Sequence, residues 1–185
     1  MLAIGLMSGT SQDGVDVVLL DTDGERIGQL GGTACRPYSE AERTLLRRAT
    51  AAAANLTDRT ARPDAVAEAE RLINEAHAEA VESLLVASGL QREQVAVVGF
   101  HGQTLIHRPG RGLTLQIGDG RALATRLGIA VVYDFRAADV AASGQGRRWR
   151  RSFTARWCGS CSAPHRLPSS ISAAWRTSPI SMASN

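Results

Sequence analysis

The segment MSGTSQDGVD, at residues 7–16, places small hydroxylated and glycine residues next to two carboxylates. Gly9 and Gly14 permit a close approach of the backbone, and successive backbone amides in such a loop form a nest that binds anions. Thr10 and Ser11 add hydroxyl donors. These groups suit the phosphates of a nucleotide, whereas a carboxylate repels phosphate.

The two carboxylates, Asp13 and Asp16, fit beside a nucleoside triphosphate if a divalent cation lies between the negative charges. Mg²⁺ prefers few carboxylates, several waters and phosphate oxygens, so either aspartate is a candidate to hold a metal-bound water. The alternative is that both carboxylates only accept hydrogen bonds from turn amides, as aspartates often do. The candidate phosphate loop comprises Gly9, Thr10, Ser11, Gln12, Asp13, Gly14, Val15 and Asp16.

Short strands must position this loop. Apolar runs predict strands at residues 2–7 and 15–21, so that the loop joins the two strands of a β-hairpin. Asp23 and Gly24 predict a second turn, which leads into a third strand at residues 26–34.

Two helices are predicted next. Ser39 and Glu42 form a capping box that opens a helix running to about residue 54. Pro63 suits the first turn of a second, longer helix, which Gly89 ends. The apolar face of that helix comprises Val66, Ala69, Ile73, Ala76, Ala80 and Leu84.

The rest of the first 146 residues alternates between strands and one short helix. Strands are predicted at residues 95–100, which run into HGQT, at 113–117, and at 129–135, which end in DFR. Asp119 caps a short helix that Gly128 closes. Three meandering strands followed by this alternation predict an α/β fold, with a mixed sheet flanked by helices.

Charge divides the chain into two parts. Residues 1–146 hold all 18 acidic side chains and 14 arginines, whereas residues 147–185 hold seven arginines and no acidic residue. The net charge of +3 therefore averages a mildly acidic domain and a basic tail, and it does not by itself indicate a nucleic-acid partner. The chain has no lysine, which excludes a Walker-type P-loop, a Schiff-base mechanism and a lysine general base.

Cysteines and apolar runs indicate the cellular setting. Cys158 and Cys161 form a Cys-x-x-Cys pair, but a zinc site is poorly supported because neither a second pair nor a histidine pair accompanies them. The first residues, MLAIGLM, are too short and uncharged for a signal peptide, and no apolar run approaches 18 residues. We therefore expect a cytoplasmic location without a membrane partner.

Residues 147–185 differ in character from the rest. They lack helical and strand periodicity and contain all three tryptophans, nine serines and three prolines. A disordered basic tail and an arm that binds membrane or RNA are two interpretations. We prefer a third, a shifted reading frame near Gly146, because lysine-free, arginine-rich composition indicates GC-rich DNA. We expect a domain at residues 1–146 and a non-native, disordered tail at 147–185.

The frame hypothesis can be tested by back-translation, in which the codon for each residue is chosen freely. Residues 168–185 can be encoded so that the same bases, read two nucleotides later, give VLNIGGMANLTDINGVK. Residues 147–154, treated in the same way, give APLAPVLH. Both strings have the pattern of ordinary protein, and the first predicts a buried strand that runs into a glycine turn.

Four motifs resemble, in order and spacing, those of the anhydro-N-acetylmuramic acid kinases. They are MSGTSQDGVD, GFHGQT at residues 99–104, LQIGDG at 115–120 and VVYDFRAADVAASGQG at 131–146. The resemblance covers essentially all of residues 1–146, and the out-of-frame VLNIGGMANLT resembles the family's next motif. It implies the N-terminal lobe of an actin-like ATPase and sugar-kinase fold.

The resemblance also implies a function. Such bacterial enzymes of cell-wall recycling open the 1,6-anhydro ring of an amino sugar with water, and they phosphorylate the freed 6-hydroxyl with ATP and Mg²⁺. Residues 9–16 match the loop that binds the ATP phosphates. The sugar side of the cleft would be lined by His101, Gln103, Asp134 and Arg136. The partners implied are the anhydro sugar and ATP, without nucleic acid, and full-length members are expected to be homodimers.

Three of these sugar-side residues have structural alternatives. His101, at a strand end, could be only a local hydrogen-bond partner. Arg136 could hold the lactyl carboxylate of the sugar in a bidentate contact, or it could pair with Asp139. Asp134 could cap a helix or a turn.

The sequence departs from the family pattern at Gln12, where an apolar residue is usual, and throughout the region after Gly146. The family's aspartate base lies in a GxDTGPGN-like segment that is absent here, as is the glycine-rich site for adenine and ribose. No carboxylate of residues 1–146 matches that base. We therefore assign no catalytic residue and expect an inactive polypeptide. Two rival functions are another sugar kinase of the same superfamily and a non-enzymatic lobe whose tail binds nucleic acid or membrane.

Overall fold

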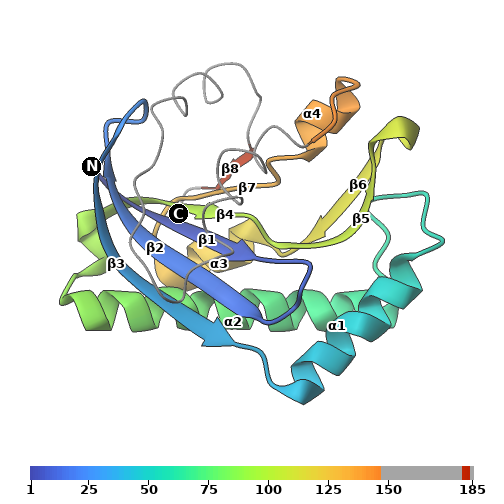
Figure 1. Ribbon diagram of the computed structural model, residues 1–185, viewed down its shortest axis with the longest axis horizontal. Helices are drawn as coiled ribbons and strands as arrows, with labels where there is room; N and C mark the ends of the chain where they lie inside the picture. The colour runs from blue at the N-terminus through green and yellow to red at the C-terminus, as the bar shows by residue number, and fades with distance from the viewer. Residues whose placement is uncertain (147–180, 184–185) are drawn as a thin grey trace.

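The computed structural model describes residues 1–146 and the strand at residues 181–183. Its main sheet has the strand order β3-β2-β1-β4-β7-β8 (Figure 1). The strands are β1 (Leu2–Ser8), β2 (Gly14–Thr22), β3 (Ile27–Pro37), β4 (Val95–Phe100), β7 (Val131–Tyr133) and β8 (Ser181–Ala183). The predicted mixed sheet flanked by helices is confirmed.

The first three strands form the predicted antiparallel meander. β1 and β2 pair from Leu2 opposite Asp21 to Ser8 opposite Val15, so the phosphate loop begins in a tight connection at the end of this hairpin. β3 pairs with β2 and continues beyond its predicted end to Pro37, which lies opposite Gly14. β3 is therefore long enough to support the far side of the loop.

The later strands β4 and β7 join the sheet by parallel pairing. β1 pairs with β4 in parallel, and β4 pairs with β7 in parallel. The carboxyl ends of these three strands, at Ser8, Phe100 and Tyr133, therefore lie along one edge of the sheet, which we call the site edge. Loops that follow parallel strands at such an edge are a common place for ligand binding in α/β folds.

Three helices flank the sheet, the second and third against its strands and the first against the second helix (Figure 1). They are α1 (Glu40–Ala53), α2 (Asp64–Ser88) and α3 (Gly120–Leu127). The predicted capping box is confirmed, because Ser39 Oγ accepts from the Glu42 amide at 3.3 Å and the Glu42 carboxylate accepts from the Ser39 amide at 2.7 Å. Pro63 is the N-cap of α2 rather than a residue of its first turn.

The core lies between α2 and the sheet. All six residues predicted for the apolar face of α2 are buried, and they pack in one cluster with the inward side chains of β1, β2 and β4. Gly89 closes α2 at a positive φ of 64°, which a residue with a Cβ adopts at a cost. The long helix therefore fixes the strands whose ends make the site edge.

Several elements differ from the predictions. β5 (Gln103–Arg108) pairs with β6 (Leu113–Ile117) in a second, two-stranded sheet, although no strand was predicted at β5. The strand predicted at residues 129–135 is only β7, because Asp134 leaves the sheet with a φ of 60°. A short helix, α4 (Ala137–Ala141), follows, and two 3₁₀ turns lie at Arg92–Gln94 and Pro109–Arg111.

Part of the C-terminal prediction lies outside the described residues. The sequence predicts that residues 147–185 lack regular structure. The structure describes only residues 181–183 of this segment, and these form β8, which pairs antiparallel with β7. The frame hypothesis and the tail at 147–180 and 184–185 fall on residues that are not described. No helix in the described part of the chain is long and apolar enough to cross a lipid bilayer.

Candidate functional site

The phosphate loop is a compact turn on the site edge. Its tip is exposed at Thr10, Ser11 and Asp13, and the Gln12 amide donates to the Gly9 carbonyl at 3.1 Å. Gln12 has a φ of 57°, a conformation that side chains other than glycine adopt rarely. Ser11 Oγ donates to Asp13 Oδ1 at 2.8 Å, so this carboxylate is held within the loop. Val15 is fully buried, so only its backbone can take part in binding.

Gly14 is needed for packing within the sheet. A Cβ at this position would lie 2.6 Å from the Arg36 carbonyl oxygen and 3.0 Å from Pro37 Cα, both of them backbone atoms of β3. A Cβ at Gly9 would meet Ser11 Oγ at 3.0 Å, inside the turn itself. The two glycines therefore allow the tight hairpin to form, which is a reason that the motif alone did not reveal.

Asp13 and Asp16 lie close enough to interact electrostatically. Burial raises the pKa of the half-buried Asp16 carboxyl, the Cys35 side chain lowers it by a hydrogen bond, and the charge of Asp13 raises it. Cys35 pairs with Asp16 across β2 and β3. Two neighbouring carboxylates of this kind favour a cation between them.

The donor set suits Mg²⁺ that is held mainly by water and phosphate. No group of three or more histidine, cysteine or acidic side chains in the described part of the chain could enclose a metal ion. Mg²⁺ requires fewer protein ligands than that, because it keeps several waters and uses phosphate oxygens. Asp13 and Asp16 therefore fit the role predicted for them, which remains a prediction.

A buried cluster, which we call the latch, holds the phosphate loop by hydrogen bonds from inside the protein. It consists of Ser8, Tyr38 and Gln103, and all three side chains are at most 2% exposed. Ser8 Oγ lies 3.1 Å from the Tyr38 hydroxyl and donates to Gln103 Oε1, while Gln103 Nε2 donates to the Gly9 carbonyl at 3.1 Å. The Tyr38 amide also donates to the Asp13 carbonyl at 2.9 Å.

The latch gives Gln103 a specific position. Gln103 was predicted to line the sugar side, and the structure places its side chain inside the protein, between the HGQT segment and the phosphate loop. It therefore connects two of the motifs directly. Burial raises the pKa of Tyr38 to about 12, so the tyrosine keeps its hydroxyl proton at neutral pH.

His101 and Asp134 follow the ends of β4 and β7 at the site edge. His101 Nδ1 lies 2.8 Å from the Gly102 carbonyl oxygen, which agrees with the alternative of a local hydrogen-bond partner. Asp134 does not cap α4 with its side chain, because Asp134 Oδ2 instead accepts from Arg59 at 2.5 Å. Both residues remain candidates for the sugar side by their position.

Arg136 is the N-cap residue of α4 and is 7% exposed. Asp139, its predicted alternative partner, directs its carboxylate to the Gly146 amide at 2.6 Å. A Cβ at Gly144 would collide with that carboxylate at 2.4 Å. The motif at residues 131–146 thus folds back on itself beside the site edge.

The LQIGDG motif packs behind the strand ends. A Cβ at Gly118 would lie 2.4 Å from the Phe100 ring, and one at Gly120 would lie 2.2 Å from the Tyr133 ring. Asp119 caps α3 by accepting from the amides of Arg121 and Ala122 at 2.9 and 3.1 Å. The motif therefore supports the site edge without reaching the loop itself.

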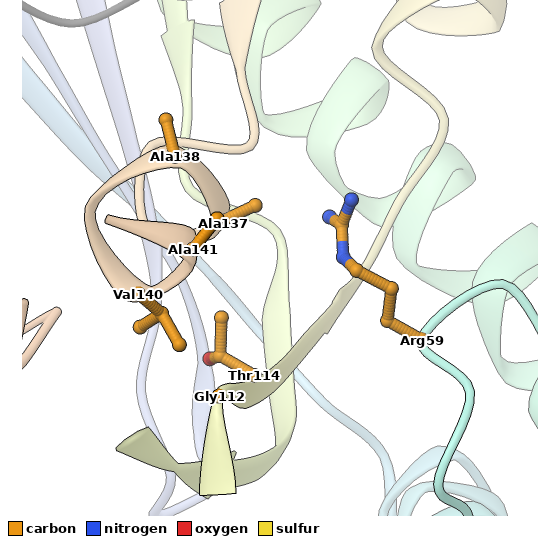
Figure 2. Close-up of a pocket in the computed structure, with 7 residues that line it drawn as sticks. All are labelled: Arg59, Gly112, Thr114, Ala137, Ala138, Val140 and Ala141. Atoms are coloured by element: carbon orange, nitrogen blue, oxygen red, sulfur yellow. The ribbon is translucent and has the colours of Figure 1, made fainter. Parts of the chain in front are cut away.

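Arg59 is a candidate residue that the sequence did not indicate. It lies in the connection between α1 and α2, in a stretch without periodicity or a motif, and the fold brings it to Asp134, 75 positions later. Figure 2 shows Arg59 at one side of a cavity of about 250 Å³, facing α4 and the start of β6. Only the three-dimensional arrangement reveals this residue.

Removing the Gln103 amide should loosen the phosphate loop. In the variant Gln103→Leu, the half-buried Gly9 carbonyl and the buried Ser8 hydroxyl each lose a partner, and we expect the free energy of unfolding to fall by about 3 kcal/mol. Urea denaturation measures this change. The matched variant Gln116→Leu, whose half-buried amide donates to Thr114 Oγ1 at 2.9 Å, should lose only about 1 kcal/mol. Equal losses in both variants would contradict a special role for the latch.

Comparison with known proteins extends these observations. The family model described as anhydro-N-acetylmuramic acid kinase matches residues 1–154. A protein of that name from Rhodopseudomonas palustris (strain BisB18) is 59% identical over 146 residues, which are 79% of this chain and 40% of that protein. One from Nitrobacter winogradskyi is 58% identical over the same shares, and one from Methylobacterium nodulans is 56% identical over 79% of this chain and 42% of its own length. The chain spans about 40% of the length of these curated relatives.

Proposed function

The chain belongs to the anhydro-N-acetylmuramic acid kinase family, and from this premise we propose that residues 1–146 form the lobe of such a kinase that binds the nucleotide phosphates and one side of the sugar. The family match also confirms the resemblance drawn from four motifs. The reaction of the whole enzyme would be hydrolytic opening and 6-phosphorylation of 1,6-anhydro-N-acetylmuramic acid, in the recycling of peptidoglycan.

One observation carries this proposal. The phosphate loop, His101 and Asp134 follow the ends of three adjacent strands, and the parallel pairing of those strands brings them to one edge. A kinase must hold the phosphates of ATP and a sugar hydroxyl side by side, because phosphoryl transfer depends on positioning and charge neutralisation. An edge that gathers phosphate-binding and sugar-binding groups meets this requirement.

The residues of the loop have distinct proposed roles. The backbone amides of residues 9–11 and the Thr10 hydroxyl would hold phosphate oxygens. The Ser11 hydroxyl, which donates to Asp13 in the structure, would exchange this carboxylate for a phosphate oxygen. Asp13 and Asp16 would hold Mg²⁺, in part through water, and the bound ion would neutralise charge on the phosphates. The latch would keep these groups in one arrangement before the nucleotide arrives.

The sugar side would be formed by His101, Asp134 and Arg136, with Gln103 acting through the latch.

We further propose a cytoplasmic location, small-molecule partners only, and homodimers for full-length members of the family. The 185-residue polypeptide itself would be inactive as a kinase, because no carboxylate in residues 1–146 matches the family's base and residues 147–185 contain none.

Binding of Mg²⁺-ATP to the 185-residue protein tests the proposal. We expect saturable binding with a Kd of about 1 mM, since half of the contacts of a micromolar site give roughly half of its binding free energy. In Gly14→Ala the new methyl group meets β3 backbone, and the shift of β3 would displace Tyr38 from Asp13. We expect this variant to lose about 2 kcal/mol of stability and to bind Mg²⁺-ATP roughly 10-fold more weakly.

Gly110→Ala is the matched control, because a Cβ at this position meets no atom within 4 Å. It should bind Mg²⁺-ATP as the wild type does, within about twofold. Isothermal titration calorimetry at several ATP concentrations measures both constants. Absence of saturable binding in the wild type, or an unchanged Kd in folded Gly14→Ala, would argue against the proposed phosphate site.

A further inference from the structure

The cavity beside Arg59 has a mixed chemical character (Figure 2). One wall is α4, which presents the small apolar side chains of Ala137, Ala138, Val140 and Ala141. Gly112 and Thr114, at the start of β6, form another part of the lining, and the Arg59 side chain stands opposite α4. None of these lining residues belongs to the sites predicted from the sequence.

Arg59 is the charged residue among the described residues that line this cavity. The Thr114 hydroxyl is already used inside the protein, since Thr114 Oγ1 accepts from Gln116 Nε2 at 2.9 Å and donates to the Ile106 carbonyl at 3.3 Å. The Arg59 side chain, by contrast, is 44% exposed. A ligand that suits this cavity therefore carries an anionic group for the guanidinium and a small apolar group for α4.

The contact between Arg59 and Asp134 would allow a ligand carboxylate to replace Asp134 as the partner of Arg59. Arg59 Nη2 donates to Asp134 Oδ2, while Asp134 Oδ1 is buried and has no hydrogen-bond partner in the described part of the chain. The pair is therefore joined through one carboxylate oxygen. A carboxylate that meets the guanidinium with both oxygens forms a stronger contact and can take the place of Asp134.

The size of the cavity limits what it can take. Pockets that enclose a whole drug-sized molecule have volumes of roughly 300–1,000 Å³. The cavity measures about 250 Å³, so it suits a side arm of a ligand better than an entire amino sugar. Its position next to Asp134, at the site edge, places that arm beside the proposed sugar.

We propose that this cavity binds the carboxylate-bearing lactyl arm of the sugar, with Arg59 exchanging Asp134 for the ligand carboxylate and α4 contacting the lactyl methyl group. This inference rests on the proposed function, because it assumes that an anhydro muramic sugar occupies the site edge. It assigns the carboxylate to Arg59 and not to Arg136, which is 7% exposed and therefore less accessible. Arg59 would then determine specificity for muramic over glucosamine sugars.

Two sugars that differ only in the lactyl arm test the inference. The full 185-residue protein is titrated with 1,6-anhydro-N-acetylmuramic acid and with 1,6-anhydro-N-acetylglucosamine, and two-dimensional NMR gives both dissociation constants. We expect the wild type to prefer the muramic sugar by about 5- to 10-fold, as for a charge-assisted contact at a partly exposed site. Arg59→Gln should abolish the preference, so that the two sugars bind with about equal Kd, and it should change the Kd of the glucosamine sugar little.

Asp134→Asn provides a test in the opposite direction. If Asp134 competes with the ligand for Arg59, its neutral amide should raise the preference for the muramic sugar above that of the wild type. A contact of Asp134 with the 4-hydroxyl, which both sugars carry, is common to the two and cancels in the ratio. Arg126→Gln removes an exposed, ion-paired arginine at the C-terminal end of α3 and should leave the preference unchanged.

The outcomes separate the two proposals. If both sugars bind and Arg59→Gln keeps the wild-type preference, the assignment of the cavity is wrong while the proposed function stands. If the preference falls equally in Arg126→Gln, a general charge effect explains it and the assignment is likewise wrong. If neither sugar binds, the proposed sugar side itself is wrong, and the inference fails with it.

Discussion

The 185-residue polypeptide, mixed with Mg²⁺-ATP and 1,6-anhydro-N-acetylmuramic acid, is expected to form no phosphorylated sugar above the uncatalysed background. Opening of the anhydro ring requires a base to activate water, and loss of a general base costs a factor of about 100 to 10,000. The candidate carboxylates at the site edge already have partners: Asp13 accepts from Ser11, and Asp134 accepts from Arg59. Residues 147–185 contain no carboxylate side chain that could replace the base.

The control is a protein in which the bases after the Gly146 codon are read in the restored frame and continued to the length of the relatives. We expect this protein to produce ADP and the 6-phosphosugar in equal amounts, followed by a coupled ADP assay and mass spectrometry. Gly14→Ala in the restored protein should reduce the rate, whereas Gly110→Ala should not. Turnover by the 185-residue polypeptide that disappears in its own Gly14→Ala variant would show that a base lies within it.

The elements that the sequence predicted well are those whose pattern is set by local physics. The face of α2 from Val66 to Leu84 is buried throughout, because a 25-residue helix against a sheet must turn one apolar stripe inward. The capping box at Ser39 and Glu42 depends only on residues three positions apart. Helix faces and caps of this kind can therefore be predicted without knowledge of the fold.

The elements that were missed depend on tertiary pairing. β5 has the sequence QTLIHR, whose polar residues give no strand alternation, and it is a strand because β6 provides its partner. β7 is shorter than its apolar run because the chain turns at Asp134, where Arg59 holds the side chain. No local signal could have given either result.

The candidate site shows the same division. The phosphate loop and its carboxylates are contiguous in the sequence, so their residue types alone indicated their chemistry. The latch joins Ser8, Tyr38 and Gln103 from three separate segments, and Arg59 reaches the site edge from a loop without a motif. The sequence had indicated Gln103 for a different role, so only the structure identified the part that these residues take in holding others in place.

The second large effect concerns His77, a fully buried histidine of α2. Its Nδ1 lies 2.7 Å from the Ile73 carbonyl and donates to it, its Nε2 has no hydrogen-bond partner in the described part of the chain, and its ring meets Phe100 edge to face at 4.8 Å. Burial lowers the pKa of His77 from 6.5 to about 3; the Ile73 carbonyl opposes this, and the charges of His101 and Arg36 add to it.

Acid should therefore destabilise the protein through His77. The unfolded chain takes up this proton below about pH 6.5, whereas the folded protein takes it up only near pH 3, so the unfolded state binds more protons between these values. The stability from a neutral His77 is complete above pH 6.5 and is lost as the pH falls toward 3. The full difference corresponds to about 4 to 5 kcal/mol.

The variant His77→Leu isolates this contribution, since leucine keeps the site apolar and cannot titrate. Urea denaturation of both proteins at intervals from pH 7 to pH 4 should show a steeper loss of stability in the wild type, by about 1.4 kcal/mol per pH unit below pH 6. Acidic groups titrate in both proteins, so the difference between the two curves removes their effect. Parallel curves would mean that the folded protein accommodates a protonated His77, and that the packing of α2 against Phe100 opens without cost at the end of β4.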